Sequence, residues 1–313
     1  MAESAVRIEG LRKRFGEIVA VDDLSLQAQP GEIFGLVGSD GAGKTTTLRL
    51  LCGLLKPDAG TMAVAGVDVL REPEQARGRL GYLPQSFGLH DDLSIAENIR
   101  YFADLFCQEM SEVAERRDEL LAATGLAEFT DRLAGDLSGG MKQKAALICA
   151  LIHRPEVLLL DEPTRGVDPV SRRDLWRIVY GLPAEGVTVI VATPDADEAE
   201  RCSRLAVLAG GAIADLGTAQ ELIARHTSRL VEVSVADQPR ARGALRELPG
   251  VAAISSLGES LRVSLTVDGP SADELAQVLR EREIAIGGAT EVEPRLVDAL
   301  LLLEARAARD GDA

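Results

Sequence analysis

The sequence predicts an α/β fold, in which helices cover a mostly parallel sheet, followed by a small α+β domain. Strand-like and helix-like runs alternate up to about residue 225. The runs 157–160 and 187–191 are almost wholly apolar, which is typical of strands buried on both faces of a parallel sheet. After His226 the pattern changes to short alternating strands. At 313 residues the chain is long enough for two cores, and we place the boundary between residues 226 and 227.

The first element with a chemical signature is a glycine-rich stretch between a predicted strand, 33–37, and a predicted helix, 46–55. It matches the pattern G-x-x-x-x-G-K-[ST] in full. Its glycines let backbone N–H groups converge on phosphate oxygens, and the helix dipole adds positive charge. Lys44 would reach the β- and γ-phosphates, and the Thr45 hydroxyl would bind Mg²⁺. A glycine-rich turn with a purely structural role is the alternative, which the flanking strand and helix disfavour. The predicted nucleotide-binding residues here are Gly38, Ser39, Asp40, Gly41, Ala42, Gly43, Lys44, Thr45 and Thr46.

From about residue 87 to residue 150 the pattern is mostly helical, which predicts a helical insertion in the α/β core. Near its end, the stretch LSGGMKQK (137–144) places Ser138, Gly139 and Gly140 at the start of a helix-like run. A serine cap and glycine amides at a helix start form a second anion site. A chain that binds one nucleotide has no obvious need for two such sites.

The next strand, 157–160, carries Asp161 to its carboxyl end, and Glu162 follows at once. Beside a phosphate loop, Asp161 is suited to hold Mg²⁺ through water, and Glu162 to act as general base on the attacking water. Without a phosphate loop, a carboxylate in this position is more often a helix cap or a loop residue.

The strand at 187–191 leads into Thr193, Pro194 and Asp195. These three residues form a good local helix start, with Thr193 as the cap, Pro194 in the first helical position and Asp195 in the first turn.

The region 227–313 predicts a ferredoxin-like order of elements, β-α-β-β-α-β. Ser271 and Glu274 have the spacing of a capping box at a helix start. The predicted strands are 230–235, 251–254, 261–267 and 283–286, and the predicted helices are 239–248, 271–282 and a final one at 294–308.

Composition limits the partners and the compartment. The net charge of −16 repels nucleic-acid phosphate, and no segregated basic patch is visible, so we expect no nucleic-acid partner. The start of the chain does not predict a signal peptide, and no apolar run approaches the ~20 residues that span a bilayer, so a membrane role would require a partner. The spacing of the cysteines predicts reduced cytosolic thiols rather than zinc or disulfide sites. The four are Cys52, Cys107, Cys149 and Cys202.

Together these motifs resemble those of the ATP-binding subunits of ABC transporters, and LSGGMKQK is similar to their signature motif. Phe15, in KRFGEIVAVDDLSL, resembles the aromatic residue that stacks on adenine. Gln85, in YLPQSFGL, resembles the Q-loop glutamine, and Asp168, in DEPTRGVDP, the D-loop aspartate. The motifs run in family order over about residues 5–222. Within the family, the resemblance is to ABC-2-type export ATPases of the drug-resistance or multidrug efflux kind.

The resemblance implies a P-loop NTPase fold with an ABC ATPase core at 1–226, a helical subdomain at about 87–150 and an accessory domain at 227–313. It implies that two copies meet head to tail, each ATP lying between the phosphate loop of one and the signature helix of the other. ATP would close the dimer and hydrolysis would open it. The implied catalytic residues are Glu162, Gln85 and Lys44, and the implied Mg²⁺ ligands are Thr45, Gln85 and Asp161.

The resemblance also implies a separate integral-membrane permease of the ABC-2 type, moved through Gln85 and the helical block. The chain would then lie in the cytoplasm, peripheral on the inner face of the membrane. The segment 87–106 is the expected docking surface, although it reads equally well as an amphipathic core helix.

One position departs from the family pattern. The family has a Thr-His pair after the strand at 187–191, and the histidine contacts the γ-phosphate, whereas this chain has Pro194. Its three histidines, His90, His153 and His226, lie elsewhere in the sequence. We therefore expect slow hydrolysis. The alternative is a regulatory module that dimerises on ATP and hardly turns over. A third reading, a soluble ABC protein acting on ribosomes or DNA, is disfavoured by the acidic charge, the single cassette and the absence of basic arms.

Overall fold

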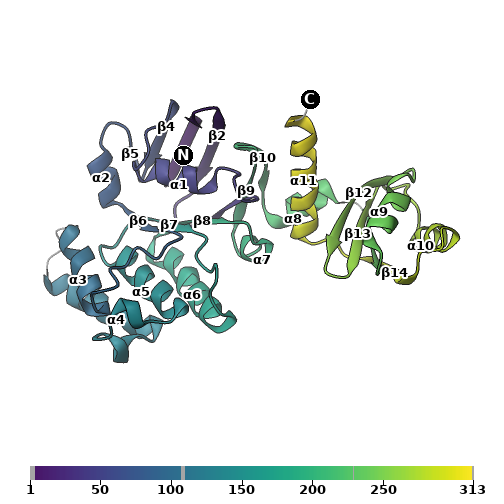
Figure 1. The fold of residues 1–313 in the computed structure, drawn as a ribbon. Coiled ribbons are helices and arrows are strands. Elements are labelled where there is room, and N and C mark those ends of the chain that lie inside the picture. Colours follow the sequence, from purple (N-terminus) through teal and green to yellow (C-terminus); the bar gives the residue numbers. More distant parts are fainter. Residues whose placement is uncertain (1–3, 107–109, 228, 312–313) are drawn as a thin grey trace. The chain divides into compact units, whose positions relative to one another are not determined.

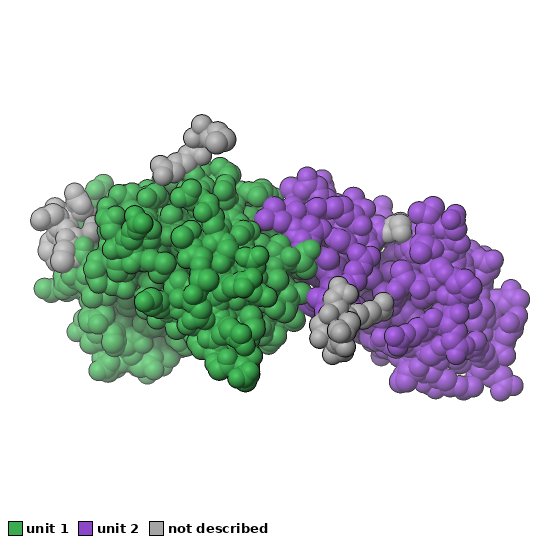
Figure 2. Space-filling view, turned by 90° about the horizontal axis from the view of Figure 1, so that it is seen from above, with its two compact units in different colours: residues 1–214 green, residues 215–313 purple. Residues whose placement is uncertain are grey.

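The computed structural model describes residues 4–106, 110–227 and 229–311, which belong to two compact units (Figure 2). The first unit comprises residues 1–214 and the second residues 215–313. Cys107 lies outside the described residues, whereas Cys52, Cys149 and Cys202 are buried free thiols. No helix in the described part of the chain is both long and apolar enough to cross a membrane.

The first unit is built on a six-stranded sheet with the order β10-β9-β3-β8-β7-β6 (Figure 1). Neighbouring strands from β9 to β6 run parallel, which confirms the α/β prediction. Every residue of β3, β7 and β8 is buried, because helices cover both faces of a parallel sheet. The strands are β3 (Ile33–Val37), β6 (Leu80–Leu83), β7 (Val157–Asp161), β8 (Thr188–Thr193), β9 (Arg204–Ala209) and β10 (Ala212–Gly217).

The register of this sheet determines where the chemistry lies. Val37 pairs with Thr193, and Asp161 pairs with Ala192. The carboxyl ends of β3, β7 and β8 therefore lie side by side at one edge, where the loops after all three strands emerge.

A second, antiparallel sheet in the same unit was not predicted. Its order is β2-β1-β4-β5. Strands β1 and β2 form a hairpin with several irregularities in register, and its last pair joins Phe15 to Ile18. The strands are β1 (Val6–Phe15), β2 (Ile18–Ala28), β4 (Ala59–Val64) and β5 (Val67–Asp68).

The helices of the first unit include a group, α3 to α5, that packs together away from the antiparallel sheet (Figure 1). Helix α1 begins and ends earlier than the predicted 46–55. It ends early because Gly53 takes a positive φ of 64° directly after its C-cap. The helices are α1 (Lys44–Leu51), α2 (Pro73–Gly78), α3 (Ile95–Leu105), α4 (Met110–Thr124), α5 (Gly139–Leu151), α6 (Pro169–Gly181) and α7 (Ala196–Ala199), with 3₁₀ turns at Ala127–Phe129, Ala134–Asp136 and Leu182–Glu185.

The second unit contains an antiparallel sheet with the order β12-β13-β11-β14. From β11 to β14 the elements follow the order β-α-β-β-α-β. Alternate residues of β11 and β13 pack with α9 and α10 in one apolar core. The elements are α8 (Ala219–His226), β11 (Arg229–Val235), α9 (Gln238–Arg246), β12 (Val251–Leu257), β13 (Ser260–Leu265), α10 (Ala272–Glu281), β14 (Ile286–Val292) and α11 (Leu296–Gly311).

Two local predictions for this unit have different outcomes. The capping box of Ser271 and Glu274 is confirmed at the start of α10. The predicted last strand, 283–286, is wrong, because Glu283 has a φ of 56° and the N–H of Ile284 donates to Leu279. These residues close α10, and the strand starts only at Ile286.

The other face of this sheet holds a buried ion pair. The guanidinium of Arg262 contacts Asp298, at the start of α11, with a distance of 2.8 Å between Nη1 and Oδ2. Its second nitrogen, Nη2, lies 3.2 Å from Oε2 of Glu232. Arg262 therefore joins β13 to α11.

Candidate nucleotide-binding site

The phosphate loop connects β3 to α1 and owes its shape to its neighbours. A Cβ atom at Gly38 would collide with the carbonyl oxygen of Leu208, and one at Gly43 would collide with that of Ala20. Gly43 also has a φ of 101°, which side chains other than glycine rarely adopt. Neither glycine can therefore be replaced without moving backbone. The first turn of α1 has no side-chain cap within the described residues, so its N–H groups face the loop.

Lys44 lies within the curve of this loop. Its ammonium Nζ donates to the carbonyl oxygens of Gly38 at 2.7 Å and Ser39 at 2.8 Å. The side chain is nearly fully buried, so its charge acts at short range on whatever occupies the loop. The other predicted loop residues extend from the exposed Ser39, Asp40 and Gly41 through the buried Ala42 to the half-buried Thr45 and Thr46.

Thr45 and Asp161 meet as the motif predicts. The Thr45 hydroxyl donates to Oδ1 of Asp161 at 2.9 Å, and the Tyr82 hydroxyl lies 3.3 Å from Oδ2. Burial raises the pKa of Asp161, while the hydrogen bond from Thr45 offsets part of that effect. A buried carboxylate beside a hydroxyl is a suitable pair of oxygen ligands for Mg²⁺.

Glu162 begins the turn after β7 in a left-handed conformation, with a φ of 50°. Its N–H donates to the carbonyl of Ala192 at 2.8 Å, which fixes it to the end of β8. Its Oε2 accepts from Nε2 of Gln85 at 3.1 Å and from Nη1 of Arg165 at 2.7 Å. The structure thus places Gln85 on the predicted general base rather than on Thr45 or Asp161.

Pro194 is exposed at the end of β8, two residues after the carbonyl that accepts from Glu162. The prediction that Thr193 caps the next helix is wrong. Asp195 is the cap of α7, its carboxylate accepting from Asp197 at 2.9 Å, and Pro194 precedes the cap instead of occupying the first helical position. The Thr193 hydroxyl donates to Oε2 of Glu198 at 2.6 Å and accepts from the N–H of Asp195 at 3.0 Å, so it bonds the cap residue itself and not an N–H of the helix.

Glu198 joins the ends of two strands. Besides the bond from Thr193, its carboxylate accepts a hydrogen bond from the Thr164 hydroxyl, and all three residues are almost completely buried. The turn after β7, which contains Glu162, and the end of β8, which precedes Pro194, are thereby held together.

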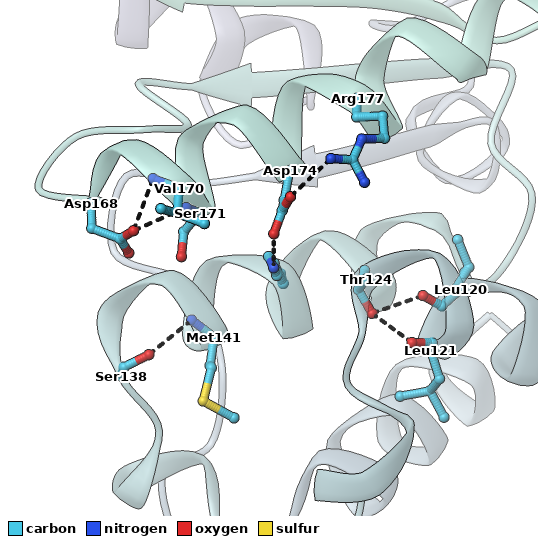
Figure 3. Close-up of polar contacts among 11 residues, drawn as sticks. Leu120, Leu121, Thr124, Ser138, Met141, Asp168, Val170, Ser171, Asp174 and Arg177 are labelled. Carbon is cyan, nitrogen blue, oxygen red and sulfur yellow. Dashed lines mark hydrogen bonds and ion pairs between the residues drawn. The ribbon is translucent and has the colours of Figure 1, made fainter.

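The second predicted anion site lies at the start of α5 (Figure 3). Ser138 caps the helix by accepting from the N–H of Met141 at 3.3 Å, as predicted, and Ser138 and Gly139 are exposed. Gly140 is buried against Ser171. The starts of α5 and α6 therefore lie next to each other.

Asp168 is the cap of α6, beside the start of α5 (Figure 3). Its Oδ1 accepts from the N–H groups of Val170 and Ser171, each at 3.0 Å. The bond from Ser171 lowers the pKa of Asp168. A carboxylate thus stands, ionised, at the exposed end of the two helices.

Phe15 ends β1 with nearly half of its surface exposed, and the Lys13 ammonium lies 5.5 Å from its ring centroid. Ala20, on the other strand of the hairpin, is the residue whose carbonyl faces Gly43. The hairpin therefore brings an exposed aromatic ring to the side of the phosphate loop.

The expected docking segment, 87–106, borders an apolar pocket of about 340 Å³. The pocket lies next to Gln85 in the chain, being lined by Pro84 and Phe87, and it extends to Phe102 and Leu105 of α3. Leu105 and Tyr101 are exposed on the same helix, whereas Ile95 and Ile99 are core residues. Part of this segment is core and part is accessible surface.

Two contributors to the site have no motif that identifies them. Arg165 lies within DEPTRGVDP without a role assigned by the motif, and its spacing of three from Glu162 is the one signal of an ion pair. Glu198 lies in an acidic run that reads as a solvated helix face, although the structure buries it. The histidines at 90 and 153 contact Tyr101 and the Leu80 carbonyl instead of the nucleotide site.

Comparison with known proteins agrees with this geometry. The family model described as ABC transporter matches residues 21–165. The probable multidrug ABC transporter ATP-binding protein YbhF of Escherichia coli (strain K12) is 39% identical over 309 residues, covering 96% of this chain and 52% of that protein. This chain thus spans about half the length of that relative.

Two further similarities cover more of the other protein. The Nod factor export ATP-binding protein I of Cupriavidus metallidurans is 41% identical over 219 residues, which cover 70% of this chain and 72% of that protein. Among solved structures, a dimeric post-hydrolysis state of an ATP-binding cassette bound to ADP and Pi superposes with a TM-score of 0.63 and 26% identity, covering 68% of this chain and 98% of the other.

Proposed function

Because this chain belongs to the ATP-binding proteins of ABC transporters, we propose that it binds and hydrolyses ATP to power an ABC-2-type exporter. The observation that carries the proposal is the meeting of a complete phosphate loop with Asp161 and Glu162 at one sheet edge, in a chain that also presents a second anion site at α5. The names of the relatives, multidrug transport and Nod factor export, support export as the direction.

Mg²⁺ fits the pair formed by Thr45 and Asp161, because both supply hard oxygen ligands and lie 2.9 Å apart. Held by these two residues, Mg²⁺ would supply positive charge that offsets the negative charge of the phosphates. The likeness of Gln85 to the family's Q-loop glutamine suggests it as a further ligand. Its Nε2 donates to Glu162 in this structure, so the oxygen of the same amide is the atom that would bind the ion.

Glu162 is proposed as the general base. Its carboxylate accepts a proton from water while the water oxygen bonds to the γ-phosphorus and the bond to the bridging oxygen breaks, which releases ADP and phosphate. Lys44 binds the β- and γ-phosphates, and Phe15 stacks on adenine.

Two copies are proposed to form the working unit. The exposed Ser138 and Gly139, with Asp168 beside them, would face the phosphate loop of the partner copy, giving two equivalent ATP sites in a twofold dimer. ATP contacts both copies only in the closed dimer, so it favours closure. The dimeric cassette with ADP and Pi supports this arrangement.

A separate membrane permease is proposed to dock on the pocket beside Gln85 and α3, which would hold the chain on the inner face of the membrane.

The second unit is proposed to be a ferredoxin-like accessory domain, on the basis of its element order and strand order. Hydrolysis is proposed to be slow, because Pro194 offers no imidazole to the γ-phosphate.

The test is to replace Glu162 with glutamine and follow the mass of the particle by light scattering. We expect Glu162→Gln to accumulate as a dimer with Mg·ATP, whereas wild type and Glu162→Gln with Mg·ADP stay monomeric. Lys44→Ala in the same background is the matched control and should not dimerise. A protein that stays monomeric in every case, or that shows no affinity for ATP, would contradict the proposal.

Pro194 also favours a second candidate, a regulatory module that dimerises on ATP without useful turnover. The same assay separates the two. If the wild-type protein, without the Glu162→Gln substitution, already accumulates as an ATP-bound dimer and releases no phosphate, the regulatory function replaces the transport motor.

A further inference from the structure

Arg165 makes the shortest contact to the proposed general base. Its Nη1 lies 2.7 Å from Oε2 of Glu162, while Nε2 of Gln85 lies 3.1 Å from the same oxygen. Both donors therefore hold one oxygen of the carboxylate. Within the described residues, Oε1 of Glu162 accepts no hydrogen bond, so this oxygen keeps its lone pairs for a proton.

The backbone strengthens the same arrangement. The N–H of Arg165 donates to the carbonyl of Glu162 at 3.2 Å, which closes the turn in which the two side chains meet. Glu162 adopts a left-handed φ of 50°, a conformation that costs free energy and persists where the surroundings impose it. Its side chain is only 8% exposed, whereas that of Arg165 is 58% exposed. The arginine thus reaches from the surface to a carboxylate that is otherwise enclosed.

We propose that Arg165 is a positioning residue for Glu162: it anchors Oε2 together with Gln85 and so presents Oε1 to the attacking water. The inference rests on the proposed ATPase function. An ordinary surface ion pair would contribute little to stability and nothing to catalysis. What distinguishes the pair here is that both donors meet on one oxygen of the base.

The test begins with the steady-state kinetics of Arg165→Ala, Arg165→Lys and wild type. A charge-assisted hydrogen bond to a carboxylate, reduced by the exposure of Arg165, predicts a fall in kcat of about 10-fold in Arg165→Ala. The KM for ATP should change by less than about 2-fold, because the interaction acts in the chemical step. Arg165→Lys keeps the charge and should recover part of the rate. Arg177→Ala is the matched control, since Arg177 also pairs with an acid three residues away, Asp174, and should keep the wild-type rate.

A second measurement separates positioning from nucleotide binding. In the Glu162→Gln background, Arg165→Ala should require the same ATP concentration for dimer formation as Glu162→Gln alone. A higher requirement, or a KM that rises as kcat falls, would mean that the guanidinium binds the nucleotide, which overturns the inference. An unchanged or raised kcat in Arg165→Ala also overturns it. Absence of hydrolysis in wild type would instead count against the proposed function itself.

Discussion

Replacing Pro194 with histidine tests whether a missing imidazole limits hydrolysis. Position 194 is exposed at the carboxyl end of β8, and this strand end lies directly beside both the phosphate loop and Glu162. An imidazole introduced there would stand at the sheet edge where the γ-phosphate is expected. Pro194 precedes the cap of α7, so the substitution leaves the helix and its cap in place.

The expected gain follows from one hydrogen bond. A charge-assisted bond contributes about 1.5–3 kcal/mol, and exposure of the site favours the lower end of that range. A contribution of about 1.5 kcal/mol in the transition state accelerates hydrolysis about 10-fold. Removing the proline ring frees the unfolded chain, which should lower stability by roughly 0.4–1 kcal/mol. The variant should therefore be faster and slightly less stable.

The assay is phosphate release at saturating Mg·ATP, with thermal unfolding measured in parallel. Pro194→Ala is the matched control, because it frees the backbone in the same way and adds no imidazole. The reasoning is refuted if Pro194→His is no faster than Pro194→Ala, since hydrolysis is then limited by something other than the absent side chain.

Three further outcomes are expected. Asp298→Ala should lower the free energy of unfolding by about 3 kcal/mol in a urea titration, because Arg262 stays buried with the more exposed Glu232 as its remaining partner; a loss no larger than that of Glu232→Ala would contradict this. In the same urea titration, Gly140→Ala should lower the free energy of unfolding by about 1–3 kcal/mol, since its Cβ would collide with Ser171. Gly139→Ala, which has room for a Cβ, should lower it by less than about 0.5 kcal/mol. Burial raises the pKa of three cysteine thiols to about 12, so these thiols should not react with a disulfide reagent at pH 8 in the native state. The same reagent should modify all four cysteines in denaturant. Rapid reaction of more than one thiol in the native state would contradict this. These cysteines are Cys52, Cys149 and Cys202.

The core sheet was predictable because its strands are buried on both faces and therefore read as apolar runs that end in polar residues. The antiparallel sheet was not, because the hairpin of β1 and β2 alternates buried with exposed residues and is interrupted by irregular register. The sequence pattern alone could not assign partners to strands of that kind.

The candidate site divides in a similar way. Motif spacing predicted the meeting of Thr45 with Asp161 and the cap at Ser138, since both depend on local sequence and on strand ends that pair in register. It did not predict the cap of α7, because Thr193 and Asp195 are both suitable cap residues, and spacing alone does not show that the Thr193 hydroxyl bonds Glu198 and the N–H of Asp195 instead of an N–H of the helix. The contact of Arg165 with Glu162 was not predicted either, because it depends on the shape of the turn between these two residues.

The collisions that exclude a Cβ at Gly38 and Gly43 have a thermodynamic consequence. Leu208 and Ala20, whose carbonyl oxygens would meet those Cβ atoms, belong to the protein scaffold. A ligand that enters the loop therefore meets a surface that is already shaped, and little backbone entropy remains to be lost on association. Loosening either neighbour should weaken affinity through the ordering of the loop.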